Sequence, residues 1–139
     1  MATNFVYKTT KEISKEDLKE LYDDNGWALY VRDLEGLQNA VANSLYVLSV
    51  WEEDKLIGLV RIVGDGYSII YVQDILVLQE YHRQGIGTIM MKDVLDKYKH
   101  VRQKTLLTDS QPKTIAFYES LGFKKSTDID CIAFVRHDF

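Results

Sequence analysis

Residues 82–87, His-Arg-Gln-Gly-Ile-Gly, place basic and amide side chains and two glycines between an apolar run and a helix-like segment. A helix that begins directly after a strand presents unpaired backbone N–H groups and the positive end of its dipole at its first turn. Glycine lets an anion approach those groups, because it has no Cβ. Residues 83–88 are therefore a candidate phosphate cradle. The simpler interpretation is a tight turn that needs glycine for a positive φ.

The spacing excludes two familiar phosphate motifs. A P-loop requires Gly-Lys-Ser or Gly-Lys-Thr after a longer glycine spacing, and the sequence contains neither. A dinucleotide fingerprint requires a third glycine where this chain has Met90. Three segments that predict antiparallel strands also precede the loop, where a Rossmann fold would begin.

Asp74 is a second residue that could do chemistry, because it interrupts the apolar segment Val-Gln-Asp-Ile-Leu-Val at 72–77. Burying a carboxylate in such a segment is costly unless it has a partner. Asp74 is therefore either a structural residue that binds nearby backbone or a functional one.

Hydrophobic periodicity predicts the elements that position these residues. Helices are expected after the capping residues Ser14 (with Asp17) and Asp33, and over 86–99 and 113–121. Strands are expected over 4–9, 45–52, 56–63, 67–78 and 105–108, with a final pair from Phe123 to Arg136. Strands joined by short turns are expected to be antiparallel neighbours. The strand–helix–strand unit over 67–108 instead predicts that its two strands are parallel. The sequence predicts one mixed α/β domain over 1–139, ordered β-α-α-β-β-β-α-β-α-β-β, with helices on both faces of the sheet.

Composition limits the class of protein. The 139 residues are 46% hydrophobic and 27% charged with a formal net charge of −4, which argues against a nucleic-acid partner bound by a general basic field. Cys131 is the single cysteine, so neither a disulfide framework nor a cysteine zinc site is expected, and we expect it to be buried in a late strand. No apolar run approaches the length of a membrane span, and no secretory signal is evident. We expect a cytoplasmic protein with no membrane partner.

Two motifs together carry a family resemblance. Residues 82–87 follow the loop pattern [QR]-x-x-G-x-[GA], and residues 116–123, Ala-Phe-Tyr-Glu-Ser-Leu-Gly-Phe, follow a helix-ending motif of the type [FL]-Y-E-x-x-G-F. The chain thus resembles the GNAT superfamily of acyl-CoA-dependent N-acyltransferases, most clearly over 45–136. His82 departs from the pattern, because the family usually has Gln or Arg there.

The resemblance implies that the co-substrate is acetyl-CoA, with no metal. Its pyrophosphate is expected on the loop and first helical turn, at Arg83, Gln84, Gly85, Ile86, Gly87 and Thr88. Its pantetheine arm is expected to pair like an added strand with Ile75, Leu76 and Val77, where the family splays two parallel strands apart. Gln111 stands where many members have an Asn that contacts the arm.

The resemblance also implies catalytic roles. Tyr118 occupies the place of the family's general acid, and a phenol with a pKa of ~10 can protonate a leaving thiolate whose thiol pKa is ~8.5. The attacking amine must first lose a proton, because an alkylammonium has a pKa of ~10.4. Asp74 is the candidate base or ammonium anchor, and Asp109 or a water chain is the alternative base.

The acceptor is expected in a pocket that the family builds from its first helices and central strands. Here Trp27, Tyr30 and Tyr71 are the candidates, with Arg32 and Tyr67 nearby in sequence, although core packing is the simpler use of such aromatics. We expect direct attack by a primary amine of a small molecule in a ternary complex, and the stretch from Trp27 resembles an arylalkylamine-acetylating branch. The alternatives are a protein or peptide acetyltransferase and a non-catalytic acyl-CoA sensor. A homodimer is also expected from the resemblance.

Overall fold

The computed structural model describes residues 4–138. These residues form two compact units that divide between Leu107 and Thr108. The first unit contains the whole sheet, and the second contains the helix with the second family motif.

The sheet of the first unit has five strands in sequence order. They are β1 (Val6–Lys8), β2 (Tyr46–Glu52), β3 (Lys55–Gly64), β4 (Ile69–Val77) and β5 (Gln103–Leu106). The first three pairings are antiparallel, and β4 pairs with β5 in parallel. The predicted directions of these five strands are confirmed. Short turns account for the β2–β3 and β3–β4 pairs, and the helical crossover from β4 to β5 accounts for the parallel pair.

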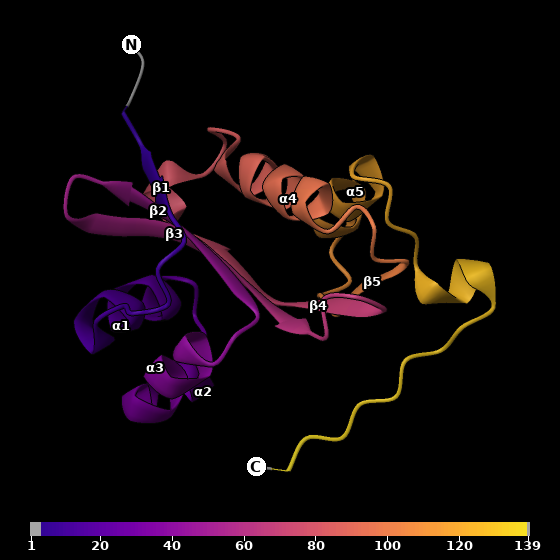
Figure 1. Ribbon diagram of the computed structural model, residues 1–139, viewed down its shortest axis with the longest axis horizontal. Helices are drawn as coiled ribbons and strands as arrows, with labels where there is room; N and C mark the ends of the chain where they lie inside the picture. The colour runs from indigo at the N-terminus through magenta and orange to yellow at the C-terminus, as the bar shows by residue number, and fades with distance from the viewer. Residues whose placement is uncertain (1–3, 139) are drawn as a thin grey trace. The chain divides into compact units, whose positions relative to one another are not determined.

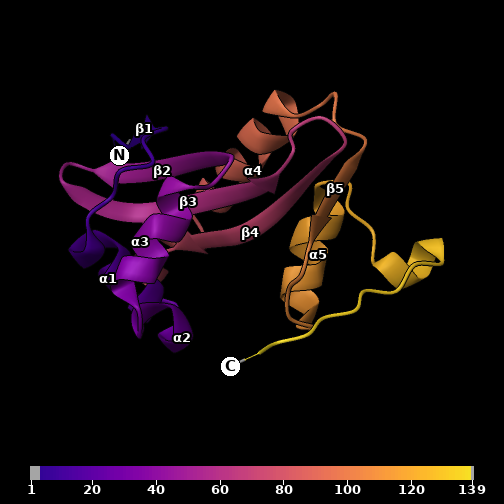
Figure 2. The same cartoon turned by 60° about the horizontal axis from the view of Figure 1, so that its bottom comes forward.

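Helices cover both faces of this sheet (Figure 1, Figure 2). One face carries α1 (Lys15–Asp24), α2 (Ala28–Val31) and α3 (Leu34–Ala42), and the other carries α4 (Ile86–Lys97). A short 3-10 helix, η1 (Gln79–Tyr81), leads from β4 toward α4. The helices bury apolar side chains at helical spacing, among them Leu18, Leu21, Leu37, Val41, Met90, Met91 and Val94. Burial of these two apolar layers supplies the main stabilisation of the unit.

The predicted helix starts are confirmed by their capping contacts. The Ser14 hydroxyl oxygen accepts a hydrogen bond from the Asp17 backbone N–H at 3.1 Å and donates to its carboxylate at 2.9 Å. The Asp33 carboxylate accepts from the Gly36 N–H at 2.9 Å. Each cap satisfies one of the N–H groups that a helix start leaves unpaired. The one-turn helix α2 between them was not predicted.

The second unit corrects the prediction of a final strand pair. It contains α5 (Pro112–Ser120) and a 3-10 helix, η2 (Ser126–Ile129), and residues 123–138 form no strand. The segment has strand-forming residues, but Ile132 and Phe134 are 73% and 94% exposed. A strand requires a partner for its backbone groups, and propensity alone does not supply one. Cys131 is accordingly exposed and not buried as expected.

Across residues 4–138, no helix combines the length and apolar composition needed to cross a bilayer. The same residues contain no group of three or more His, Cys, Asp or Glu side chains arranged to hold a metal ion.

Candidate active site

The edge of β4 that faces β5 is paired over only half its length. β5 pairs with Ile69–Val72, and no other strand of the described chain pairs with that edge beyond Val72. On its other edge, β4 stays paired with β3 as far as Val77. The segment 73–77 therefore has a strand on one side and an open backbone edge on the other.

The open edge presents the backbone of alternate residues. The Leu78 N–H donates to the Ile57 carbonyl on the β3 side at 2.9 Å. Because successive residues of a strand direct their N–H and C=O groups to opposite sides, those of Ile75 and Val77 point to the open edge. The backbone of Leu76 points to β3, so two of the three residues expected to pair with an extended ligand have the orientation for it.

His82 closes part of this edge and links it to the glycine loop. Its Nε2 lies 2.8 Å from the Val77 carbonyl oxygen, which also accepts a hydrogen bond from the Asn25 side chain at 3.4 Å. No pattern in the sequence predicts this contact, because it depends on the geometry of η1. The Val77 N–H and both backbone groups of Ile75 remain directed at the open edge.

The loop places backbone amides around the start of α4. Arg83 and Gly85 both have positive φ, 67° and 77°, and Gly85 is the N-cap of the helix with no side-chain cap. The first bond of the helix runs from the Ile89 N–H to the Gly85 carbonyl, so the N–H groups of Ile86–Thr88 have no partner within the helix. A Cβ at Gly85 would have no atom within 4 Å, which leaves open space at the cradle. Arg83 accepts a backbone conformation that costs about 1 kcal/mol for a non-glycine residue.

A β-bulge in β4 determines which side chains share a face. Asp74 lies opposite Arg61 of β3, yet the next β3 residue lies opposite Val72, so Gln73 is the extra residue. A bulge shifts the alternation of side chains by one position. Asp74 and Tyr71 therefore point to the same face, the one covered by α1. Burial raises the pKa of Tyr71, and the negative charge of Asp74 adds to this effect.

Asp74 is the centre of a buried polar network on that face. It is 1% exposed, and its Oδ2 accepts hydrogen bonds from Arg61 Nε and from the Tyr22 hydroxyl, both at 2.8 Å. Its Oδ1 accepts from the Tyr30 hydroxyl at 3.1 Å. Arg61 is itself 6% exposed. The expectation that a carboxylate here needs a partner is thus met by a guanidinium and two phenols.

Two of the predicted pocket residues, Tyr30 and Trp27, lie beside this network. Tyr30 is half-buried, and its ring lies 5.2 Å from that of Tyr22 and 5.6 Å from that of Trp27, centroid to centroid. The Tyr30 oxygen also accepts a hydrogen bond from the Gln73 side chain at 3.2 Å. Tyr67, in contrast, is 82% exposed in the turn after β3.

The second unit carries the other predicted catalytic residue. Tyr118 lies on α5, half-buried, with its ring 5.0 Å from Phe117 and 5.9 Å from Phe123. Burial raises the pKa of Tyr118 to about 12, and the negative charge of Asp109 adds to the effect. The Asp109 carboxylate accepts a hydrogen bond from the Gln111 N–H at 2.9 Å just before the helix begins. Tyr118 therefore keeps its proton at neutral pH, as a general acid must.

Comparison with known proteins identifies the family of the chain. The sequence profile of the acetyltransferase (GNAT) domain matches residues 9–137. The chain belongs to the GNAT acetyltransferase family. The predicted family, its mixed α/β fold and its assignment as an acyltransferase are confirmed.

Among solved structures, a GNAT family acetyltransferase of Streptococcus pneumoniae TIGR4 is 35% identical with a TM-score of 0.86, and the match covers 97% of this chain and 98% of that one. An uncharacterized N-acetyltransferase, ycf52-like, of Prochlorococcus marinus is 28% identical over 86% of this chain and 67% of its own length. The histone acetyltransferase TAP1 of Glycine max is 28% identical over 86% of this chain and 55% of its own length. This chain thus spans about two thirds of one relative and about half of the other.

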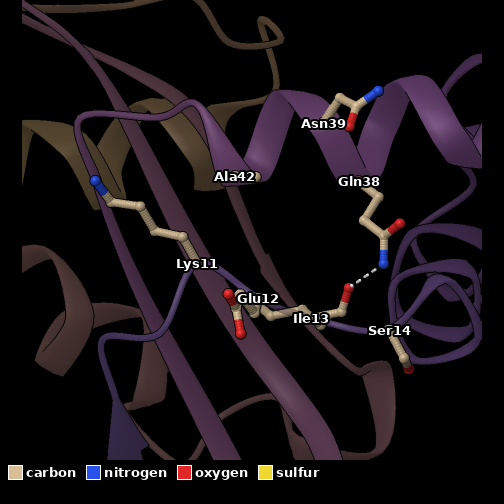
Figure 3. A pocket seen from close by; sticks show the side chains of 7 residues that line it. All are labelled: Lys11, Glu12, Ile13, Ser14, Gln38, Asn39 and Ala42. Atoms are coloured by element: carbon tan, nitrogen blue, oxygen red, sulfur yellow. Dashed lines mark hydrogen bonds between the residues drawn. The ribbon is translucent and has the colours of Figure 1, made fainter.

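The acetyltransferase also has a surface pocket away from the predicted site. It has a volume of about 380 Å³ and lies between the segment before α1 and the helix α3 (Figure 3). The Gln38 side chain donates a hydrogen bond to the Ile13 carbonyl at its wall, at 2.9 Å. None of the residues that line it is a predicted cofactor, acceptor or catalytic residue.

Proposed function

We propose that this acetyltransferase transfers the acetyl group of acetyl-CoA to a primary amine of a small molecule by direct attack in a ternary complex. The observation that carries the proposal is the open edge of β4 beside an uncapped helix start. The N–H groups of Ile86–Thr88 and the two loop residues with positive φ suit a pyrophosphate. The backbone of Ile75 and the N–H of Val77 suit the amide groups of a pantetheine arm, which would add to the sheet as a peptide does.

In the reaction, the amine nitrogen forms a bond to the thioester carbonyl carbon, and the carbon–sulfur bond breaks. Tyr118 donates its phenolic proton to the departing thiolate, a role that rests on its place in the family motif and on its protonated state at neutral pH. Gln111, just before α5, is assigned to the arm on the motif alone.

Deprotonation of the amine is the step for which Asp74 and Asp109 were the candidates. Asp74 already accepts three hydrogen bonds and is almost fully buried, so only one of about four acceptor positions, on Oδ1, is left for a proton or an ammonium group. These contacts make direct action on the amine, as base or as anchor, the weaker of the available assignments. We assign the proton transfer to water or Asp109.

A polypeptide acceptor is the second candidate, because one relative is named a histone acetyltransferase. A half-buried aromatic pair at Trp27 and Tyr30 favours a small amine, since a peptide requires an open groove. A non-catalytic acyl-CoA sensor has no use for a tyrosine at the catalytic position of the motif.

The test is release of the CoA thiol from acetyl-CoA with separate acceptors: 2-phenylethylamine, spermidine, an aminoglycoside, an amino acid and a lysine-containing peptide. We expect turnover with the arylalkylamine and a lower kcat/KM with the peptide. Peptide acetylation as the faster reaction would replace the small-amine proposal. Binding of acetyl-CoA without thiol release from any acceptor would favour the sensor.

Three broader expectations also stay proposals. The profile match over 9–137 includes residues of both units, which supports one acetyltransferase domain over 1–139. A cytoplasmic location and a homodimer rest on the composition of the chain and the family resemblance alone.

A further inference from the structure

We propose that the Tyr30 hydroxyl oxygen is the group that receives the acceptor amine, and that Asp74, held by Arg61, is a positioning residue that fixes the orientation of this hydroxyl. This inference rests on the proposed function, since it names the residue that selects the acceptor at the same site.

The hydrogen-bond inventory of Tyr30 sets the chemistry of its next partner. A phenol has one O–H donor and two acceptor positions. The donor is used on Asp74 Oδ1 at 3.1 Å, and one acceptor position is used by the Gln73 side-chain amide at 3.2 Å. Any further partner of the oxygen must therefore be a hydrogen-bond donor. An amine qualifies, whereas a carboxylate or a carbonyl does not.

Of the two phenols, Tyr30 is the one whose residue keeps exposed surface. Tyr22 and Tyr30 donate to the same carboxylate, from α1 and α2. Tyr22 is 0% exposed, and Tyr30 is only half-buried. The pair therefore offers a built-in comparison between a structural phenol and an accessible one.

The position of the Tyr30 hydroxyl matches the place where an acceptor must approach. Its partner Gln73 is the first β4 residue beyond the pairing with β5, so the hydroxyl lies where the open edge begins. Trp27 lies beside it with its ring tilted 31° to that of Tyr30. This aromatic wall suits an amine with an apolar or aromatic substituent, through apolar contact and ring packing.

The charge of the network suits a nucleophile. Arg61 offsets the charge of Asp74, so the pair behind the hydroxyl is formally neutral. A lone carboxylate would favour the ammonium form, which cannot attack. A phenol oxygen backed by an ion pair accepts an N–H from the neutral amine without strongly favouring its protonated form.

The decisive experiment compares Tyr30→Phe with Tyr22→Phe as a matched control, with 2-phenylethylamine as the acceptor. Both changes remove one hydroxyl from the same carboxylate. For Tyr30→Phe we expect the KM for the amine to rise about fivefold to tenfold, with the KM for acetyl-CoA unchanged. For Tyr22→Phe we expect a lower Tm and an unchanged amine KM. An unchanged amine KM in Tyr30→Phe, or equal effects of the two changes, would overturn the proposal.

A binding measurement without acetyl-CoA separates this proposal from the proposed function. We expect 2-phenylethylamine to raise the Tm of the wild-type protein, 3-phenylpropanoate to leave it unchanged, and Tyr30→Phe to lose most of the amine effect. An absence of thiol release together with these shifts would contradict the proposed reaction and keep the Tyr30 assignment. Equal shifts with the amine and the carboxylate would reject Tyr30 as a donor-selective site.

The role of Asp74 has its own readout. A positioning residue predicts that Asp74→Asn raises the amine KM but leaves the shape of the pH profile of kcat/KM unchanged. Loss of the acidic limb of that profile would identify Asp74 as the base and contradict the positioning role. Tyr30→Phe and Tyr22→Phe decide the proposal even if Asp74→Asn fails to fold.

Discussion

Arg61 and Asp74 occupy directly opposite positions on β3 and β4, and the Nε of one lies 2.8 Å from the Oδ2 of the other. Both side chains are buried, and every donor around the carboxylate comes from another element or strand. The ion pair therefore joins the central strands to the helices α1 and α2.

Removing one charge of this pair is predicted to destabilise the first unit strongly. Arg61→Leu leaves Asp74 buried without its cation, which costs about 3–5 kcal/mol of the free energy of unfolding. Urea denaturation measures the change. Lys19→Ala is the control, because it breaks the exposed pair with Asp23 and should cost less than about 1 kcal/mol. An Arg61→Leu effect as small as that of the control would contradict the conclusion that buried Asp74 depends on Arg61 as its partner.

Gly85→Ala is predicted to weaken the interaction with acetyl-CoA more than its effect on folding explains. Alanine at a φ of 77° costs about 1 kcal/mol, and its methyl group enters the space where the proposed pyrophosphate approaches. Gly66→Ala is matched in backbone strain, with a φ of 76°, and lies in the turn between β3 and β4. We expect similar losses of Tm in both variants and a raised KM for acetyl-CoA in Gly85→Ala alone. A raised KM in both would show that strain and not the cradle is responsible.

Tyr118→Phe is predicted to lower kcat about a hundredfold, because general acid catalysis typically contributes at least that much. The KM values for both substrates should change little, since the change removes one hydroxyl that acts on the departing sulfur. Steady-state kinetics of thiol release measure both. Full activity in Tyr118→Phe would transfer the acid role to another group and leave the cofactor assignment in place.

The raised pKa of Tyr118 also predicts a loss of stability at alkaline pH. The unfolded phenol ionises near pH 10 and the folded one near pH 12, so the folded state holds its proton more tightly. The contribution of Tyr118 to the free energy of unfolding is complete below pH 10 and disappears as the pH rises to about 12. We expect a contribution of up to about 2 kcal/mol, allowing for partial exposure. The difference in unfolding free energy between wild type and Tyr118→Phe, measured from pH 9 to 12, should shrink by that amount; a constant difference would argue against it.

Local signals account for the parts of the fold that were predicted correctly. Ser14 and Asp33 cap their helices through residues three positions away, and the turn at Glu53 joins strands that can only be neighbours. The helix start at the glycine loop was predictable for the same reason, because its signal lies within six residues. These features need no knowledge of the rest of the chain.

The polar network could not be predicted because it depends on strand register. Arg61 and Asp74 each stand out as a charge in an apolar strand, which is a signal that could have paired them. The bulge at Gln73 sets which residues meet, and it has no clear sequence signature. Tyr22 lies in the helix predicted after Ser14, and nothing in the sequence marks it as a partner of Asp74. The final strand pair was wrong because residues 132–136 have the composition of a strand, while the pairing depends on a partner far along the chain.

Gln73, the extra residue of the bulge, separates two halves of β4 whose proposed roles use different groups. On one side of the bulge, Ile75 and Val77 use backbone groups, which every amino acid possesses. On the other, Tyr71 and the surroundings of Tyr30 depend on side-chain identity. If both proposed sites hold, substitutions around the helices can change the choice of amine while the backbone edge proposed for acetyl-CoA stays intact. Deleting Gln73 would close the bulge and remove the amide that donates to the Tyr30 hydroxyl, but Tyr71 and Asp74 would stay on the same face, because Val72 and Asp74 already lie opposite consecutive residues of β3.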